Sequence, residues 1–68
     1  MEWHEAYGEG IQRFAWDEGA MELVIEWRRG TYRYPAPIEV FWRLRDSDEK
    51  TSYFNTRIKP FYPGRRGN

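Results

Sequence analysis

Basic and aromatic side chains alternate near the C-terminal end of the sequence, where they could bind a nucleic acid. The members of this group are Arg57, Lys59, Arg65, Arg66, Tyr53 and Tyr62. Arginine and lysine bind phosphates, and aromatic rings stack on unpaired bases with roughly 1–3 kcal/mol per base. We therefore expect a non-enzymatic RNA- or nucleic-acid-binding site here. A solvated helix face is the other interpretation of Arg57 and Lys59 that the sequence leaves open.

A second set of residues indicates protein recognition instead. Trp42 falls outside the apolar stripe of the helix expected around it, and its neighbours are Arg43 and Arg45. Exposed tryptophan and arginine are enriched at the hot spots of protein interfaces. The alternative hypothesis is therefore a protein–protein interaction regulator that uses these three residues.

Catalytic chemistry has little support in the sequence. His4 is the single histidine and there is no cysteine, so a thiolate zinc site is excluded and a Ser–His pair would need this N-terminal residue. The nearby Glu2, Glu5 and Glu9 are better explained as a solvated acidic edge than as a hard-cation site. We expect no catalytic residue, no metal site and no cofactor.

The formal net charge is zero, but the charges are unevenly distributed. Residues 1–26 contain seven acidic residues and one basic residue, whereas residues 27–68 contain ten basic and four acidic residues. Such an asymmetry indicates a charged partner. Neutralisation of one half by the other across a sheet explains it equally well, and both interpretations stay open.

The length of 68 residues allows one domain at most, and it has no disulfide to stabilise it. Four Trp, five Tyr and four Phe must supply most of the core, since each can bury roughly 150–250 Å². No apolar run approaches the roughly 20 residues of a membrane span, and no signal peptide is recognisable. We expect a cytoplasmic protein without a membrane partner.

The first half of the chain has the pattern of an antiparallel sheet. Residues 11–16 and 21–27 flank a four-residue turn, and apolar and acidic residues alternate in the second segment as in a half-buried strand. Residues 28–30 form a second tight turn before a short strand at 31–35. Residues 2–7 are either a fourth, edge strand or an arm. The sequence predicts a three- or four-stranded meander because the connections are short.

The second half has helical spacing. Its first apolar stripe consists of Pro37, Val40, Phe41 and Leu44. A second short helix contains Phe54 and Ile58, which are four residues apart and should face the sheet. The predicted fold class is α+β, with two short C-terminal helices packed on one face of the meander.

Three strings of the sequence, YRYP at 32–35, PIEVFWRL at 37–44 and YFNTRIKPFYP at 53–63, resemble the KTSC domain. This short module occurs at the end of some bacterial lysyl-tRNA synthetases and as small free-standing proteins, including phage-encoded ones. Thr51 and Glu49 depart from the Gly and Ser of the family pattern. The resemblance implies a small β-meander with two helices, and it implies no catalytic residue.

The resemblance also sets the expected organisation and partners. The chain is one domain, 1–68, with a KTSC-like core at 11–63, an N-terminal arm or edge strand at 1–10 and a flexible tail at 64–68. The expected partner is a nucleic acid, with tRNA as one candidate, or in the alternative a partner protein such as a host enzyme modulated by a phage-encoded protein. The sequence does not indicate the oligomeric state.

Overall fold

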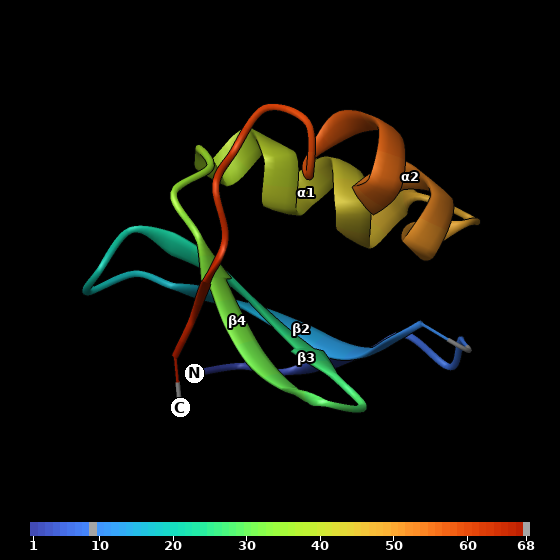
Figure 1. The fold of residues 1–68 in the computed structure, drawn as a ribbon, viewed down its shortest axis with the longest axis horizontal. Coiled ribbons are helices and arrows are strands. Elements are labelled where there is room, and N and C mark those ends of the chain that lie inside the picture. The colour runs from blue at the N-terminus through green and yellow to red at the C-terminus, as the bar shows by residue number, and fades with distance from the viewer. Residues whose placement is uncertain (9, 68) are drawn as a thin grey trace.

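The computed structural model describes residues 1–8 and 10–67 of the chain, so Glu9 of the expected acidic edge and Asn68 of the expected tail lie outside it. Within these residues, five antiparallel strands form one sheet and two helices cover one of its faces (Figure 1). The elements in chain order are β1 (His4–Glu5), β2 (Ile11–Asp17), β3 (Glu22–Trp27), β4 (Gly30–Tyr34), α1 (Ile38–Asp46), α2 (Lys50–Arg57) and β5 (Arg65–Arg66). The predicted α+β meander with two helices is confirmed.

The three central strands form the predicted meander because two short turns join them. The β2–β3 register places Phe14 opposite Ile25 and Trp16 opposite Leu23. Asp17 ends β2, and its Oδ1 accepts a hydrogen bond from the backbone N–H of Ala20 at 3.2 Å, which closes the turn. The second turn ends at Gly30, which has φ +146°, a conformation that side chains rarely adopt.

The two edge strands extend the sheet beyond the predicted meander. In β1, His4 pairs with Phe14, so the edge-strand interpretation of the N-terminal residues holds for two of them. In β5, Arg66 pairs with Tyr32 and Arg65 with Arg33. These two residues lie in the segment expected as a flexible tail, and in the structure they pair with β4 as a short strand. Their pairing with β4 satisfies backbone groups that an open edge would leave unpaired, and no local pattern in the sequence indicates it.

The hydrophobic core lies between the helices and the sheet. Its buried members are Ile11, Phe14, Leu23, Ile25, Tyr34, Ala36, Val40, Phe41, Leu44, Phe54 and Ile58. Half-buried Trp16, Trp27 and Tyr32 pack against this cluster. The predicted helix stripes therefore face the sheet. Pro37 is the exception, because it is the exposed N-cap residue of α1.

The outer face of the sheet is covered by ion pairs instead of helices. Ala15 and Val24 pair with each other in the β2–β3 ladder, and both are fully buried although neither belongs to the core cluster. Arg33, the ladder partner of Val24, donates to Asp17 at 2.7 Å. Long charged side chains can cover apolar surface in this way. This arrangement explains why Val24 interrupts the alternation of β3.

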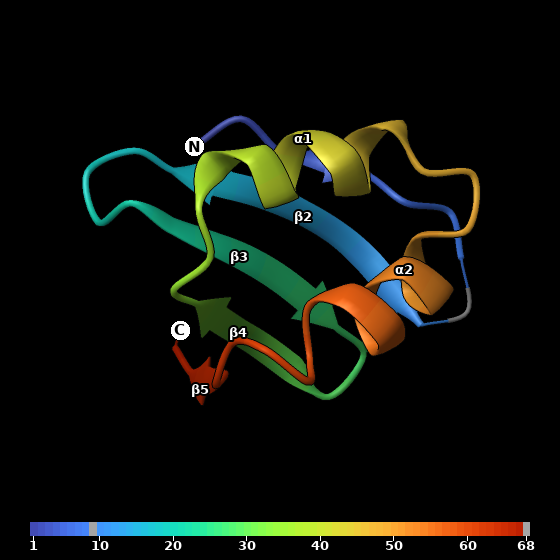
Figure 2. The same ribbon diagram turned by 90° about the horizontal axis from the view of Figure 1, so that it is seen from above.

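The segment that follows α2 returns the chain to the sheet and runs beside β4 to reach β5 (Figure 2). Gly64 in this segment lies so close to the ring of Tyr34 that an added Cβ would collide with it. We call residues 62–67 the C-terminal strap. In the part of the chain that the structure describes, no helix has the length and apolar character required to cross a membrane.

Candidate nucleic-acid interface

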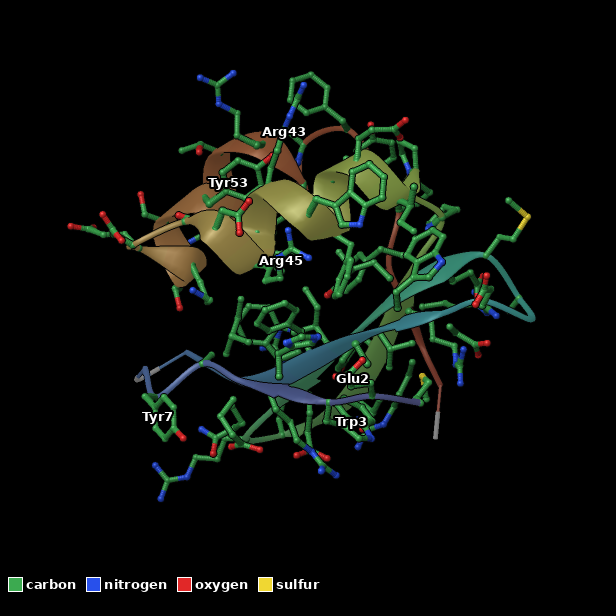
Figure 3. All side chains as sticks on the ribbon, turned by 180° about the vertical axis from the view of Figure 1, so that it is seen from behind. Glu2, Trp3, Tyr7, Arg43, Arg45 and Tyr53 are labelled. Atoms are coloured by element: carbon green, nitrogen blue, oxygen red, sulfur yellow. The ribbon has the colours of Figure 1, made fainter. Side chains whose placement is uncertain are left out.

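A groove lies between α1, α2 and the turn after α2. It has a volume of about 520 Å³ and is lined by Val40, Arg43, Tyr53, Arg57, Phe61 and Tyr62. Arg43 and Arg57 come from the last turns of the two helices. Figure 3 shows Arg43 and Tyr53 on the helical layer, on the side away from the sheet. The groove therefore combines two cations with three aromatic side chains.

The backbone of buried Ile58 holds the turn that forms one wall of this groove. Its carbonyl oxygen accepts hydrogen bonds from the backbone N–H groups of Phe61 at 3.1 Å and Tyr62 at 2.9 Å. The resulting turn leaves Phe61 67% exposed, whereas Tyr62 is half-buried. Because Arg57 directly precedes Ile58, its side chain remains at the surface.

A second pocket, of about 290 Å³, lies on the other side of Tyr62, between the sheet and α2. Its aromatic lining consists of Trp27, Tyr32, Tyr34, Phe54 and Tyr62, and its polar lining includes Arg29, Asn55 and Lys59. Burial raises the pKa of the Tyr34 hydroxyl. This hydroxyl is therefore neutral at physiological pH. We call this cavity the aromatic pocket.

A third groove, of about 310 Å³, continues from the aromatic pocket along the β3–β4 turn. It shares Trp27, Arg29 and Asn55 with that pocket, and it adds Arg28 and Thr51. Tyr62 lines both the groove beside Arg43 and the aromatic pocket, and the aromatic pocket in turn shares residues with the third groove. The three cavities therefore form one continuous surface around α2. We call this surface the basic belt; its cations are Arg28, Arg29, Arg43, Arg57 and Lys59.

Among the residues that the structure describes, none that lines the basic belt carries a carboxylate. No Asp or Glu of this set lines any of its three cavities. By contrast, two other cavities of the molecule are lined by acidic residues, one by Glu2, Asp17 and Glu18 and the other by Asp48 and Glu49. The positive charge of the second half of the chain is thus concentrated around α2.

The belt cations are also available for a partner. Within residues 1–8 and 10–67, no carboxylate lies within 4.0 Å of the charged nitrogens of Arg43, Arg57 or Lys59. Arg29 stands over the ring of Tyr32 at 5.6 Å, and no carboxylate of the described residues forms an ion pair with it. An anionic ligand could pair with these groups without breaking an existing ion pair.

Two of the predicted site residues are engaged elsewhere. Arg65 donates two hydrogen bonds to the carboxylate of Glu22. This pairing lowers the pKa of Glu22 and raises the pKa of Arg65. Arg66 donates to the backbone oxygen of Arg29 at 3.0 Å and stands 5.9 Å from the ring of Tyr32. The six predicted residues are therefore divided. Arg57, Lys59, Tyr53 and Tyr62 line the basic belt, whereas Arg65 and Arg66 lie outside it, in the last part of the strap.

Acidic residues of β2 and β3 also neutralise Arg33. Arg33 bonds Asp17 at 2.7 Å and lies 3.5 Å from Glu22. The hydrogen bond from Arg33 is the main cause of the lowered pKa of Asp17. Neutralisation across the sheet therefore accounts for part of the charge asymmetry, and the five cations of the basic belt account for another part.

The three residues of the protein-binding alternative do not share one groove. Trp42 is 44% exposed on α1. Arg43 lines the basic belt, whereas Arg45 is paired with Asp46 and lines the cavity next to His4. The side chains diverge because residues on a helix are separated by about 100° each. Figure 3 shows Arg45 nearer to the sheet than Arg43.

His4 has a packing role. Its ring stacks on Phe14 at 5.5 Å and meets Phe41 edge-on at 5.5 Å. Among the described residues there is no group of three His, Cys, Asp or Glu side chains that could hold a metal ion.

Trp27, Tyr32, Asn55 and the arginine pair of the β3–β4 turn line the belt but were not predicted as site residues from the sequence. One signal could have located them. Phe54 belongs to the core and Trp27 packs against it, with their rings 4.8 Å apart. Residues that follow them directly, namely Arg28 and Asn55, must therefore come close together at the surface.

Comparison with known proteins agrees with this architecture. A model of the KTSC domain matches residues 9–62, which confirms the resemblance noted in the sequence. The crystal structure of a KTSC domain protein from Yersinia pestis superimposes with a TM-score of 0.87 and 22% sequence identity, over 98% of this chain and 97% of that chain. At this identity the similarity concerns the fold. No curated protein gives a significant match.

Proposed function

This chain belongs to the KTSC domain family, and we propose that it is a small non-enzymatic module that binds single-stranded RNA or another nucleic acid along the basic belt. The observation that supports the proposal is the separation of charges on the surface. Arginines near the acidic strands are paired, whereas those around α2 face cavities without a carboxylate from the described residues.

The aromatic residues of the belt make an unpaired strand a better ligand than a duplex. Tyr53, Phe61 and Tyr62 line the same groove as Arg43 and Arg57; Phe61 is exposed and the two tyrosines are half-buried. Aromatic platforms bind splayed bases, while flanking cations bind the phosphates between them. A duplex would use the cations but leave these rings without a partner.

Transfer RNA is a suitable first ligand to test. The resemblance places related modules at the end of some lysyl-tRNA synthetases, and tRNA has single-stranded loops and a single-stranded end. An RNA with these features offers both phosphates and accessible bases to the belt. This assignment of ligand is part of the proposal.

The proposal is tested by titrating a labelled single-stranded oligoribonucleotide into the protein at low salt and following fluorescence anisotropy. Arg43→Gln combined with Arg57→Gln should weaken binding about tenfold or more, since two charge-assisted contacts of roughly 1 kcal/mol each are removed. Arg45→Gln is the matched control, because it removes the same charge from α1 outside the belt. It should bind nearly as the unmodified protein does. Equal losses in both variants, or no binding by the unmodified protein, would reject the proposal.

The rival function, a regulator that binds a partner protein, has one specific observation in its favour. Trp42 is a large aromatic residue of α1 that is 44% exposed. If this function is correct, Trp42→Ala abolishes capture of the partner protein while the belt variants do not. The oligonucleotide titration above would then show no specific binding.

A further inference from the structure

The aromatic pocket has the features of a site for one planar group. Its floor is Phe54, which is almost fully buried, with the ring of Trp27 edge-on at 4.8 Å and that of Tyr34 edge-on at 5.2 Å. Half-buried Tyr32 and Tyr62 complete the walls. Of these rings, those of Trp27, Tyr32 and Tyr62 are partly exposed and can contact a second ring.

Contacts among the lining residues hold the pocket in shape without a ligand. The indole Nε1–H of Trp27 donates to the hydroxyl oxygen of Tyr34 at 3.3 Å. The strap closes one side, because Gly64 lies against the ring of Tyr34 and the adjacent Tyr62 is fixed by its hydrogen bond to Ile58. A preformed pocket binds its ligand with less loss of conformational entropy than one that must be ordered on binding.

The polar groups of the pocket define the chemistry of its ligand. Arg29 and Lys59 are both exposed, and no described acidic residue lines the pocket beside them, so an anion is favoured. Asn55 is also exposed, and its carboxamide offers both donors and an acceptor, the combination that pairs with the edge of a base. A volume of about 290 Å³ is close to the lower limit of ligand pockets and suits one ring system rather than a larger ligand.

We infer that the aromatic pocket takes one unpaired base, whose edge is read by Asn55 and whose phosphate is bound by Arg29 and Lys59. This inference rests on the proposed function and makes it more specific. The groove beside Arg43 and Arg57 binds the strand on one side of Tyr62, and the pocket receives a base on the other side. Binding of this kind gives the module a preference for certain bases, which phosphate contacts alone cannot provide.

The test uses nuclear magnetic resonance of the ¹⁵N-labelled full chain, with nucleoside monophosphates as the probes and inorganic phosphate at the same ionic strength as the reference. The indole N–H signal of Trp27, assigned with Trp27→Phe, reports directly on the pocket. We expect a saturable shift of this signal with at least one nucleotide and none with phosphate. We expect Asn55→Ala to weaken nucleotide affinity severalfold and to reduce the discrimination among bases. Ser52→Ala, an exposed position on α2 outside the pocket, should change neither.

The possible failures are distinguishable. If the oligonucleotide binds the belt but Trp27 does not respond to any nucleotide, the base pocket is rejected and the proposed function stands. An identical shift with inorganic phosphate would also reject it, because the rings would then have no part in binding. If neither the oligonucleotide nor a nucleotide binds, the pocket and the proposed function both fail.

Discussion

Arg33 and Arg57 have the same side chain in opposite surroundings. Arg33 is bonded to Asp17, lies close to Glu22 and covers buried Val24, whereas no described carboxylate pairs with Arg57 beside α2. The fold therefore uses one arginine for stability and leaves the other for a ligand. A residue's charge alone does not distinguish these roles.

We predict that Arg33→Gln destabilises the protein measurably, because Asp17 loses its counter-ion, Glu22 keeps only Arg65, and Val24 loses its cover. Arg57→Gln should stay within about 0.5 kcal/mol of the unmodified protein, as is usual for exposed positions. The free energy of unfolding from urea titration measures both. Equal stability of the two variants would contradict the distinction between paired and free arginines.

The same ion pairs predict how stability depends on pH. Hydrogen bonds from Arg33 and Arg65 lower the pKa values of Asp17 and Glu22 in the folded state. Their contribution is therefore complete above the ordinary pKa values of 3.8 and 4.5, and it is lost as the pH falls through the lower folded values. The urea midpoint should decrease between neutral pH and pH 3, and it should decrease less in Glu22→Gln. A midpoint independent of pH in this range would show that the pairs do not stabilise the fold.

The sequence was sufficient to predict which helix residues are buried, but not which charged residues pair with one another. Helical spacing was sufficient to place Phe54 and Ile58 in the core, since burial follows from the period of one helix. The partners of Arg33 and Arg65 could not be predicted in this way. They depend on which strands are neighbours and on the register, which are properties of the assembled sheet.

Among the elements, the C-terminal strap connects the fold to the candidate site. It begins with Tyr62, which lines both the groove and the aromatic pocket, and it ends with β5 on the edge of β4. Gly67 completes this pairing by donating its N–H to the backbone oxygen of Thr31 at 2.9 Å. The walls of the site thus depend on a two-residue strand.

We predict that Gly64→Ala displaces the strap, because the new methyl group would collide with the ring of Tyr34. Amide hydrogen exchange of Gly67 should accelerate, and nucleotide binding in the aromatic pocket should weaken. Gly19→Ala is the matched control, since a Cβ there meets only ordinary contact with Asp17 at 3.6 Å. Unchanged exchange at Gly67 in the Gly64 variant would show that the strap does not depend on this close approach.

Element prediction from the sequence succeeded where the pattern was local. Alternating residues located β2 and β3, and helical spacing located both helices. The strand β5 was missed because Arg65 and Arg66 have neither alternation nor high strand propensity. They form a strand only because β4 offers them an unpaired edge.

At the scale of the whole molecule, the zero net charge conceals two different surfaces. The outer face of the sheet is neutralised by ion pairs such as that of Arg13 with Glu26 at 2.9 Å, and Trp3 lies over this arginine at 4.2 Å. The basic belt lies around α2, with its groove between the two helices on the opposite side of the molecule (Figure 3). The sequence indicated the asymmetry of charge, and only the folded structure separates the paired cations from the unpaired ones.

The most direct test of this account is the salt dependence of single-stranded RNA affinity for the unmodified protein and for a variant with Arg43→Gln, Arg57→Gln and Lys59→Gln. For single strands, log K falls against log salt with a slope of about −0.7 for each phosphate neutralised. We predict a slope that is smaller by roughly 2 in the triple variant, with little change in Arg45→Gln. Binding that is insensitive to salt, or a triple variant with the slope of the unmodified protein, would contradict the claim that the basic belt binds phosphates.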